Sequence, residues 1–186
     1  MTHNKAVKNC YITIFMVLLI KGYAQNKQVT FPPLSSPVTV KGTKAKGKIK
    51  IDGILNEKDW ENIKPISNFF KIEPKQGGKY LYTTEVRILF DEKNLYIGAF
   101  CKDSLGKKGV RVQDLRRDFN YGENDVFGVQ IDAQNTKQFS VSFQTTPNGN
   151  QKDLQVFNGK NKDIDWNALW NVKTTRTDNG YCVEFA

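Results

Sequence analysis

Apolar residues stand at every second position from Val86 to Phe90 and again from Leu95 to Cys101, on either side of the acidic segment Asp91-Glu-Lys-Asn94. Alternation on both sides of a four-residue turn predicts an antiparallel hairpin with one buried face. The positions expected on the buried face are Val86, Ile88 and Phe90 in the first strand, and Leu95, Ile97, Ala99 and Cys101 in the second.

Six further stretches complete the predicted β-structure. Residues 69–72, 126–132, 139–145, 154–157, 170–176 and 181–185 have strand-like apolar patterns, and the turns Pro147-Asn-Gly149 and Asp178-Asn-Gly180 interrupt them. Many short strands with regular turns are typical of an all-β protein. We therefore predict an antiparallel β-sandwich, similar to a jelly roll.

One short helix is expected near the start of this sandwich. Residues 56–63 fit one or two helical turns, with Asn56 as the N-cap and acidic residues in the first turn, and Pro65 ends the pattern. Trp60 is expected on the inner side of the helix as a large apolar core residue.

The N-terminal residues have the pattern of a secretory signal peptide. Lys5 and Lys8 precede the apolar run 11–20, and the small residues Gly22 and Ala24 follow it. The run is too short to span a bilayer as a free helix, although an uncleaved anchor is the alternative. We expect a signal peptide at 1–24, a Pro- and Lys-rich linker or first edge strand at 25–47 and a folded module at 48–186. The protein would then be exported to the periplasm, the outer membrane or the extracellular space.

The net charge of +9 is concentrated at the front of the chain. Residues 53–186 contain 19 Lys and Arg against 18 Asp and Glu, so the predicted module is nearly neutral. A nucleic-acid-binding domain is expected to carry a basic face. We therefore expect no nucleic-acid partner.

Cysteine and histidine limit the chemistry. After removal of residues 1–24, Cys101 and Cys182 remain, which allow one disulfide or two free thiols packed in strands. The only histidine is His3, so catalysis built on histidine is not expected in the mature chain. Ala186 follows an apolar strand without a turn or polar tail, so the chain is expected to be the front piece of a longer protein or a truncated product.

Residues 48–186 resemble carbohydrate-binding module family 9, within the DOMON-like β-sandwich group. Five segments carry the resemblance in the family's order: Ile51-Asp-Gly53, Trp60, the hairpin 85–98 followed by Asp103, Asn124-Asp-Val-Phe-Gly-Val-Gln-Ile-Asp132, and Asp178-Asn-Gly-Tyr-Cys-Val-Glu184. Arg117-Asp118, Phe143 with Pro147-Asn-Gly149, and the segment 165–170 resemble a subset at the N-terminus of large bacterial outer-envelope proteins. In that subset, the module precedes a β-rich region thought to be a membrane barrel.

The resemblance implies a non-catalytic module that binds a polysaccharide or oligosaccharide, in the context of carbohydrate catabolism. Sugar rings stack their C–H faces on aromatic rings, while their hydroxyls need polar partners. The family's stacking tryptophan, which precedes the strand that begins near Asp125, is absent here, and the zone contains Phe119 and Tyr121 instead. The predicted ligand-binding residues are Arg117, Phe119, Tyr121, Glu123, Asn124 and Trp166. Trp166 and Trp170, four residues apart, would share one face of a helical turn.

Two alternatives remain open. The module would act as a structural or assembly domain of an outer-membrane barrel protein without a sugar site, or as part of an O-glycosyl hydrolase. A hydrolase needs two carboxylates that face each other across a cleft, for which Asp118, Glu123, Asp125 and Glu184 are available.

No cofactor is clearly indicated. Asn161, Asp163 and Asp165 alternate, which would direct three oxygen ligands to the same side and suits calcium. No glycine or closing glutamate completes an EF-hand loop, so a simple polar loop is the alternative.

Overall fold

The computed structural model describes residues 38–186, except 75–76 and 78–79. The predicted signal peptide and residues 25–37 of the predicted linker lie outside these described residues. Within the described part of the chain, no helix has the length and apolar character needed to cross a membrane.

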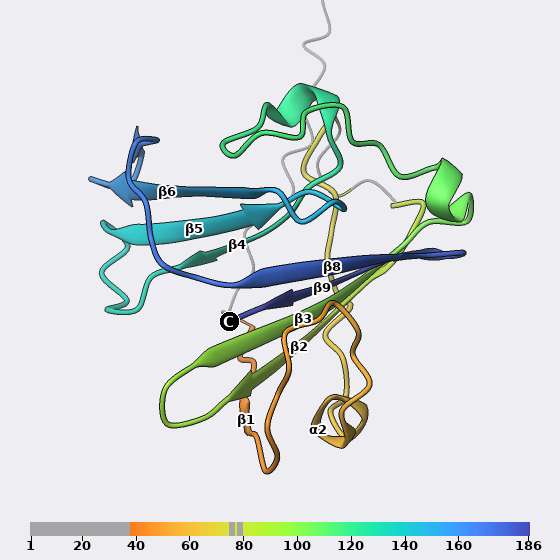
Figure 1. Ribbon diagram of the computed structural model, residues 1–186. Coiled ribbons are helices and arrows are strands. Elements are labelled where there is room, and N and C mark those ends of the chain that lie inside the picture. The colour runs from red at the N-terminus through yellow and green to blue at the C-terminus, as the bar shows by residue number, and fades with distance from the viewer. Residues whose placement is uncertain (1–37, 75–76, 78–79) are drawn as a thin grey trace, which may run out of the picture. The chain divides into compact units, whose positions relative to one another are not determined.

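Two sheets lie in separate layers (Figure 1). The first sheet has the strand order β1 (Thr43–Lys44), β2 (Thr84–Phe90), β3 (Leu95–Lys102), β9 (Gly180–Phe185) and β8 (Val172–Thr177). The second has the order β4 (Phe127–Ile131), β5 (Ser140–Thr145), β6 (Gln151–Phe157) and β7 (Asn161–Asp163). Only β1, which runs parallel to β2, departs from the antiparallel pairing of the named strands. The predicted all-β sandwich is confirmed.

The predicted hairpin is present with its expected register. Phe90 pairs with Leu95, and the pairing continues to Thr84 opposite Cys101. Asp91 closes the turn, because its Oδ1 accepts hydrogen bonds from the backbone N–H groups of Lys93 at 2.7 Å and Asn94 at 2.8 Å. An aspartate at this position offers the acceptor that the turn needs.

The main core lies between the two sheets. It contains Val86, Ile97, Ala99 and Val183, together with Phe127 and Phe185 and other buried residues. The ring centres of Phe127 in β4 and Phe185 in β9 are 5.7 Å apart, so the two rings connect the two layers directly. Burial of this apolar surface is the main favourable term in folding.

The hairpin has two covered faces, whereas the sequence predicted one. Leu89 and Tyr96 point to the side opposite the main core, and both are buried against Ile49 and Trp60 in a second apolar cluster. A Cβ atom at Gly98 would lie 3.2 Å from the Trp60 ring, so the glycine allows the indole to pack on β3. The segment before β2 therefore forms an outer cover, which alternation within the hairpin does not reveal.

Glu184 joins this outer cover to the sheet. Its Oε2 accepts hydrogen bonds from the backbone N–H groups of Asp52 at 2.9 Å and Gly53 at 2.7 Å, and its Oε1 accepts one from Trp60 Nε1 at 3.1 Å. The side chain is fully buried, and this burial raises the pKa of the Glu184 carboxyl. Gly53 has φ +84°, a conformation that favours glycine.

Three local predictions need correction. The helix α2 (Lys58–Glu61) is shorter than expected, and its N-cap is Glu57 rather than Asn56. Residues 69–72 form no strand, and the isolated bridge that precedes them pairs Ile66 with Val86. The short strand β7 was not predicted, because Asn161–Asp163 contains no apolar residue.

The two cysteines of the described chain are free thiols, so the predicted disulfide alternative is wrong here. Cys101 pairs with Tyr181, whereas Cys182 pairs with Phe100. Paired residues share a face and successive residues alternate, so the two sulfur atoms lie on opposite faces of the sheet.

Replacement of the Glu184 carboxylate should weaken the fold. In Glu184→Gln, an amide N–H₂ would face either Trp60 Nε1–H or the two backbone N–H groups, so buried donors would lose their acceptor. We expect the free energy of unfolding to fall by about 1–3 kcal/mol in urea denaturation. Glu92→Gln, which alters an exposed ion pair with Lys44, should change it by less than about 0.5 kcal/mol. Equal effects of the two substitutions would contradict this assignment.

Candidate functional site

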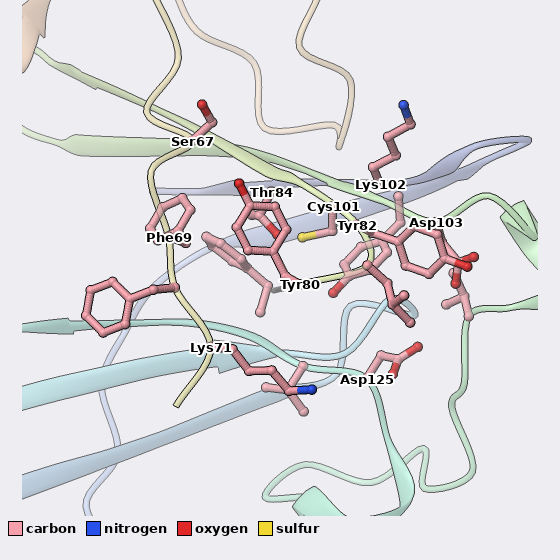
Figure 2. A pocket seen from close by; sticks show the side chains of 16 residues that line it. Ser67, Phe69, Lys71, Tyr80, Tyr82, Thr84, Cys101, Lys102, Asp103 and Asp125 are labelled. Carbon is pink, nitrogen blue, oxygen red and sulfur yellow. The ribbon is translucent and has the colours of Figure 1, made fainter. Parts of the chain in front are cut away.

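A pocket of about 470 Å³ opens at one end of the sandwich, where β2 begins, β3 ends and β4 begins (Figure 2). Its lining comes from four parts of the chain: residues 67–71, 80–84, 101–103 and 125–127, with Val110 and Tyr181 in addition. The volume lies within the range of roughly 300–1,000 Å³ that is usual for small-molecule sites.

Aromatic rings dominate the wall of the pocket. Phe69, Phe70, Tyr80 and Tyr82 each expose between 39% and 46% of their surface. Large aromatic residues are more often buried, where their apolar area contributes to stability. Rings held at a pocket in this partly exposed state can stack on a ligand.

Polar groups accompany the rings. Asp103 and Asp125 lie on one side of the view in Figure 2, and Lys71, Lys102 and Ser67 also line the pocket. One oxygen of each carboxylate is held by backbone: Leu105 N–H donates to Asp103 Oδ1 and Arg111 N–H donates to Asp125 Oδ2, both at 2.8 Å. Among the described residues, no donor hydrogen-bonds to the second oxygen of either carboxylate, so each can accept from a ligand.

Cys101 and Tyr181 contribute neutral groups to the lining. Burial raises the pKa of the Cys101 thiol to about 11 and also raises the pKa of Tyr181. A thiol with this pKa is protonated near neutral pH, and the thiol form is a poor nucleophile. This arrangement suits binding better than covalent chemistry.

Two loops are fastened together beside the pocket. Lys102 N–H donates to the Thr83 carbonyl at 3.0 Å, and Ser104 Oγ donates to Tyr82 Oη at 2.9 Å. Asp103 N–H donates to the Asn179 carbonyl at 2.9 Å, which ties the second loop to the turn before β9. The hydroxyl of Tyr82 is therefore held by Ser104 of the neighbouring loop.

Two of the residues predicted from the sequence to bind a ligand are buried in the structure. Phe119 is fully buried, so its ring offers no stacking face to a sugar. Asn124 is also buried, and its side chain serves the loop: Oδ1 accepts from Gln113 N–H at 2.9 Å and Asp114 N–H at 3.1 Å. Both residues therefore support the loop, and their prediction as ligand contacts did not account for their burial.

Tyr121 and Glu123 remain exposed. The Tyr121 hydroxyl donates to Gln144 Oε1, and the Lys152 ammonium lies 5.1 Å from the centre of the Tyr121 ring. Gln144 lies in β5 and Lys152 in β6, so Tyr121 lies beside these two strands, and neither Tyr121 nor Glu123 lines the aromatic pocket.

Arg117 and Trp166 belong to a different cluster. The guanidinium of Arg117 donates to Asn167 Oδ1 at 3.0 Å and to Gln151 Oε1 at 2.9 Å, and it also contacts the buried carboxylate of Asp153. Trp166 packs beside Phe143, with ring centres 6.3 Å apart. Residues 164–171 form no helix, so the predicted shared helical face of Trp166 and Trp170 is wrong, although both rings contact Phe143. The six predicted residues are therefore divided between two clusters and two buried positions, and their role in ligand binding stays a prediction.

The predicted calcium ligands lie at the edge of the second sheet. Asn161 and Asp163 fall on one face of β7, as their alternation predicted, but Asp165 lies beyond the strand and its N–H donates to Asp163 Oδ1 at 3.1 Å. Within residues 38–74, 77 and 80–186, no group of three or more His, Cys, Asp and Glu side chains is arranged to hold a metal ion. Calcium binding stays a prediction.

The aromatic pocket was not predicted. Its sequence signal was the density of aromatic residues in 69–82, a region that also contains Pro74, Gly77 and Gly78. Aromatic residues in a Gly- and Pro-containing loop indicate rings that no regular element buries. The interpretation of 69–72 as a strand hid this signal.

Comparisons with known proteins agree with the fold. The profile of the family described as carbohydrate family 9 binding domain-like matches residues 51–186. The structure is similar to a carbohydrate binding module family 9 from Caldicellulosiruptor kristjanssonii in complex with cellotriose, with a TM-score of 0.52 and 15% sequence identity. The similarity covers 78% of this chain and 66% of that chain, which is slightly less than two thirds. A search of curated proteins found no match.

The loop that carries Phe119 and Tyr121 should loosen in acid. Arg116 holds the pKa of Asp114 at about 2, so this carboxylate contributes stability above its unfolded pKa that is lost as the pH falls through about 4 to 2. In Asp114→Asn, residue 114 cannot titrate, so the free energy of unfolding of the variant should depend less on pH across this window than that of the wild type. The prediction would be contradicted if the unfolding free energies of variant and wild type fell in parallel between pH 4 and pH 2.

Proposed function

Because the chain belongs to the carbohydrate family 9 binding domain-like family, we propose that it binds an oligosaccharide or polysaccharide in the aromatic pocket. The observation that carries the proposal is the set of four partly exposed rings around one opening: Phe69, Phe70, Tyr80 and Tyr82. The structural neighbour was determined with cellotriose, which supports a glycan as the ligand.

The rings match the apolar part of a sugar. A pyranose presents a face of C–H groups, and an aromatic ring of similar area can cover it and exclude water. Tyr80 and Tyr82 also carry hydroxyl groups, which give each ring a polar end at the solvent boundary.

The polar groups match the hydroxyls. The second oxygens of Asp103 and Asp125 can accept hydrogen bonds, and the ammonium groups of Lys71 and Lys102 can donate them. A ligand with neighbouring hydroxyl groups satisfies donors and acceptors together, whereas a purely apolar ligand would leave these groups unpaired.

The remaining features of the proposal follow from chemistry and sequence. The protonated Cys101 thiol and neutral Tyr181 in the lining favour binding without catalysis. The predicted signal peptide supports export, and export gives access to extracellular or envelope glycans in carbohydrate catabolism. The near balance of charge over 53–186 favours a neutral glycan over nucleic acid.

Loss of one stacking ring should weaken glycan binding. We expect Tyr80→Ala to reduce the affinity for a glycan identified on an array by roughly tenfold, which corresponds to about 1.4 kcal/mol. Tyr80→Phe keeps the ring and should remain within about threefold of the wild type. Titration calorimetry measures both. Phe157→Ala, which removes a ring 39% exposed and outside the pocket lining, is the matched control.

Two outcomes would contradict this site: wild-type affinity in Tyr80→Ala, or a loss of affinity in Phe157→Ala as large as that in Tyr80→Ala. A folded wild-type chain that retains no glycan on an array, with or without calcium, would contradict glycan binding itself.

The sequence-predicted residues provide a separate test. Tyr121 and Trp166 lie outside the pocket lining, so the double variant Tyr121→Ala/Trp166→Ala should keep glycan affinity within about twofold of the wild type. Affinity electrophoresis in glycan-containing gels compares the variants directly. Loss of retention with an unchanged thermal midpoint would move the site to these residues.

A further inference from the structure

Ser104 holds one ring of the aromatic pocket without belonging to the pocket lining. Its Oγ donates to Tyr82 Oη at 2.9 Å, and Tyr82 is one of the four partly exposed rings around the opening. Tyr80, the other tyrosine among these rings, has no side-chain hydrogen bond to any residue that the structure describes. The contact with Ser104 therefore distinguishes Tyr82 from the other rings.

The backbone around Tyr82 does little to fix the ring. Tyr82 lies two residues before β2, outside any regular element. The Thr83 carbonyl accepts from Lys102 N–H at 3.0 Å, but within the described part of the chain the backbone groups of residues 80–82 make no hydrogen bond. A tyrosine side chain rotates about two torsions, and a partly exposed ring in a loop changes rotamer readily unless a contact holds it. The bond from Ser104 supplies that contact.

The loop that carries Ser104 is itself fixed to the sandwich. Asp103 N–H donates to the Asn179 carbonyl at 2.9 Å. Gly106 has φ +54°, and a Cβ atom there would lie 2.1 Å from the Asp178 carbonyl oxygen, so the loop packs directly on the β8–β9 turn. Ser104 therefore has a defined position relative to the strands.

The direction of the bond also determines what the Tyr82 hydroxyl offers to a ligand. A hydroxyl group has one hydrogen to donate and two lone pairs that accept. Because the Tyr82 oxygen accepts from Ser104, its own hydrogen can be donated to a sugar hydroxyl, and linked hydrogen bonds strengthen one another. Asp103, which precedes Ser104, supplies an acceptor in the same part of the pocket (Figure 2). A sugar stacked on Tyr82 then meets a donor and an acceptor together.

We propose that Ser104 is the positioning residue of the aromatic pocket. It lies outside the lining and acts through Tyr82, because its hydrogen bond holds the ring in the orientation that stacks on a sugar. The inference rests on the glycan-binding function proposed above and adds the residue that prepares the pocket for its ligand. When fewer molecules hold the ring in the competent orientation, the apparent dissociation constant rises in inverse proportion to that fraction.

The glycan affinity of Ser104 variants tests the proposal. Ser104→Ala removes the donor, and we expect titration calorimetry with a glycan identified on an array to show an affinity about threefold to tenfold below that of the wild type. Ser104→Thr keeps a hydroxyl group at the same position and should remain within about twofold of the wild type. Lys108→Ala changes an exposed residue of the same loop outside the lining and is the matched control.

A double-mutant cycle separates positioning of the ring from a general effect on the fold. In the Tyr82→Phe background the partner hydroxyl is absent, so Ser104→Ala should change the affinity by less than about twofold further. Equal losses from Ser104→Ala in the two backgrounds would overturn the proposal. Wild-type affinity in Ser104→Ala would overturn it as well, and would leave the glycan-binding function standing.

Fluorine NMR of protein that contains fluorotyrosine tests the contact without a ligand. Tyr82→Phe identifies the Tyr82 resonance by its absence. Ser104→Ala should shift or broaden this resonance, whereas Lys108→Ala should leave it unchanged. An unchanged resonance in Ser104→Ala would overturn the proposal. A wild-type chain that retains no glycan, together with a shifted Tyr82 resonance in Ser104→Ala, would contradict the proposed function and keep the contact, so the two failures are distinguishable.

Discussion

The buried carboxylate of Glu184 is the interaction on which the rest of the structure depends. It accepts hydrogen bonds from segments 124 to 132 residues earlier in the chain, and so joins the last strand to the outer cover. Burying a carboxylate without partners is costly, and three N–H donors offset that cost. With this contact in place, Trp60 packs against Gly98 on β3 and both faces of the central strands are covered.

The pocket follows from this framework. The central strands β2 and β3 are covered on both faces, so their ends are rigid supports for the loops that continue from them. Thr84 at the start of β2 and Cys101 at the end of β3 both line the pocket. The rings of residues 69–82 therefore stay exposed beside a rigid support, although no regular element contains them.

The sequence predicted the strands well because alternation is a local property. The hairpin 84–101 and the strands β4, β5, β8 and β9 agree with the pattern to within about two residues. Which loop residues are buried and which are exposed depends instead on tertiary contacts. Phe119 was predicted to bind a ligand but is buried, while Tyr80 and Tyr82 attracted no prediction but line the pocket. Whether an aromatic residue in a loop is buried or exposed depends on what packs on it, and the local sequence does not contain that information.

The backbone N–H of Lys102 donates to the Thr83 carbonyl, and this bond joins the two loops of the pocket whatever side chains they carry. Side chains that recognise a ligand can therefore change without loss of this contact. The carboxylate, glycine and indole that hold the sandwich together lie on the outer cover and on the strands. Residues 67–82 are then free to diverge during evolution, and relatives with the same architecture can acquire different ligands through changes in one loop.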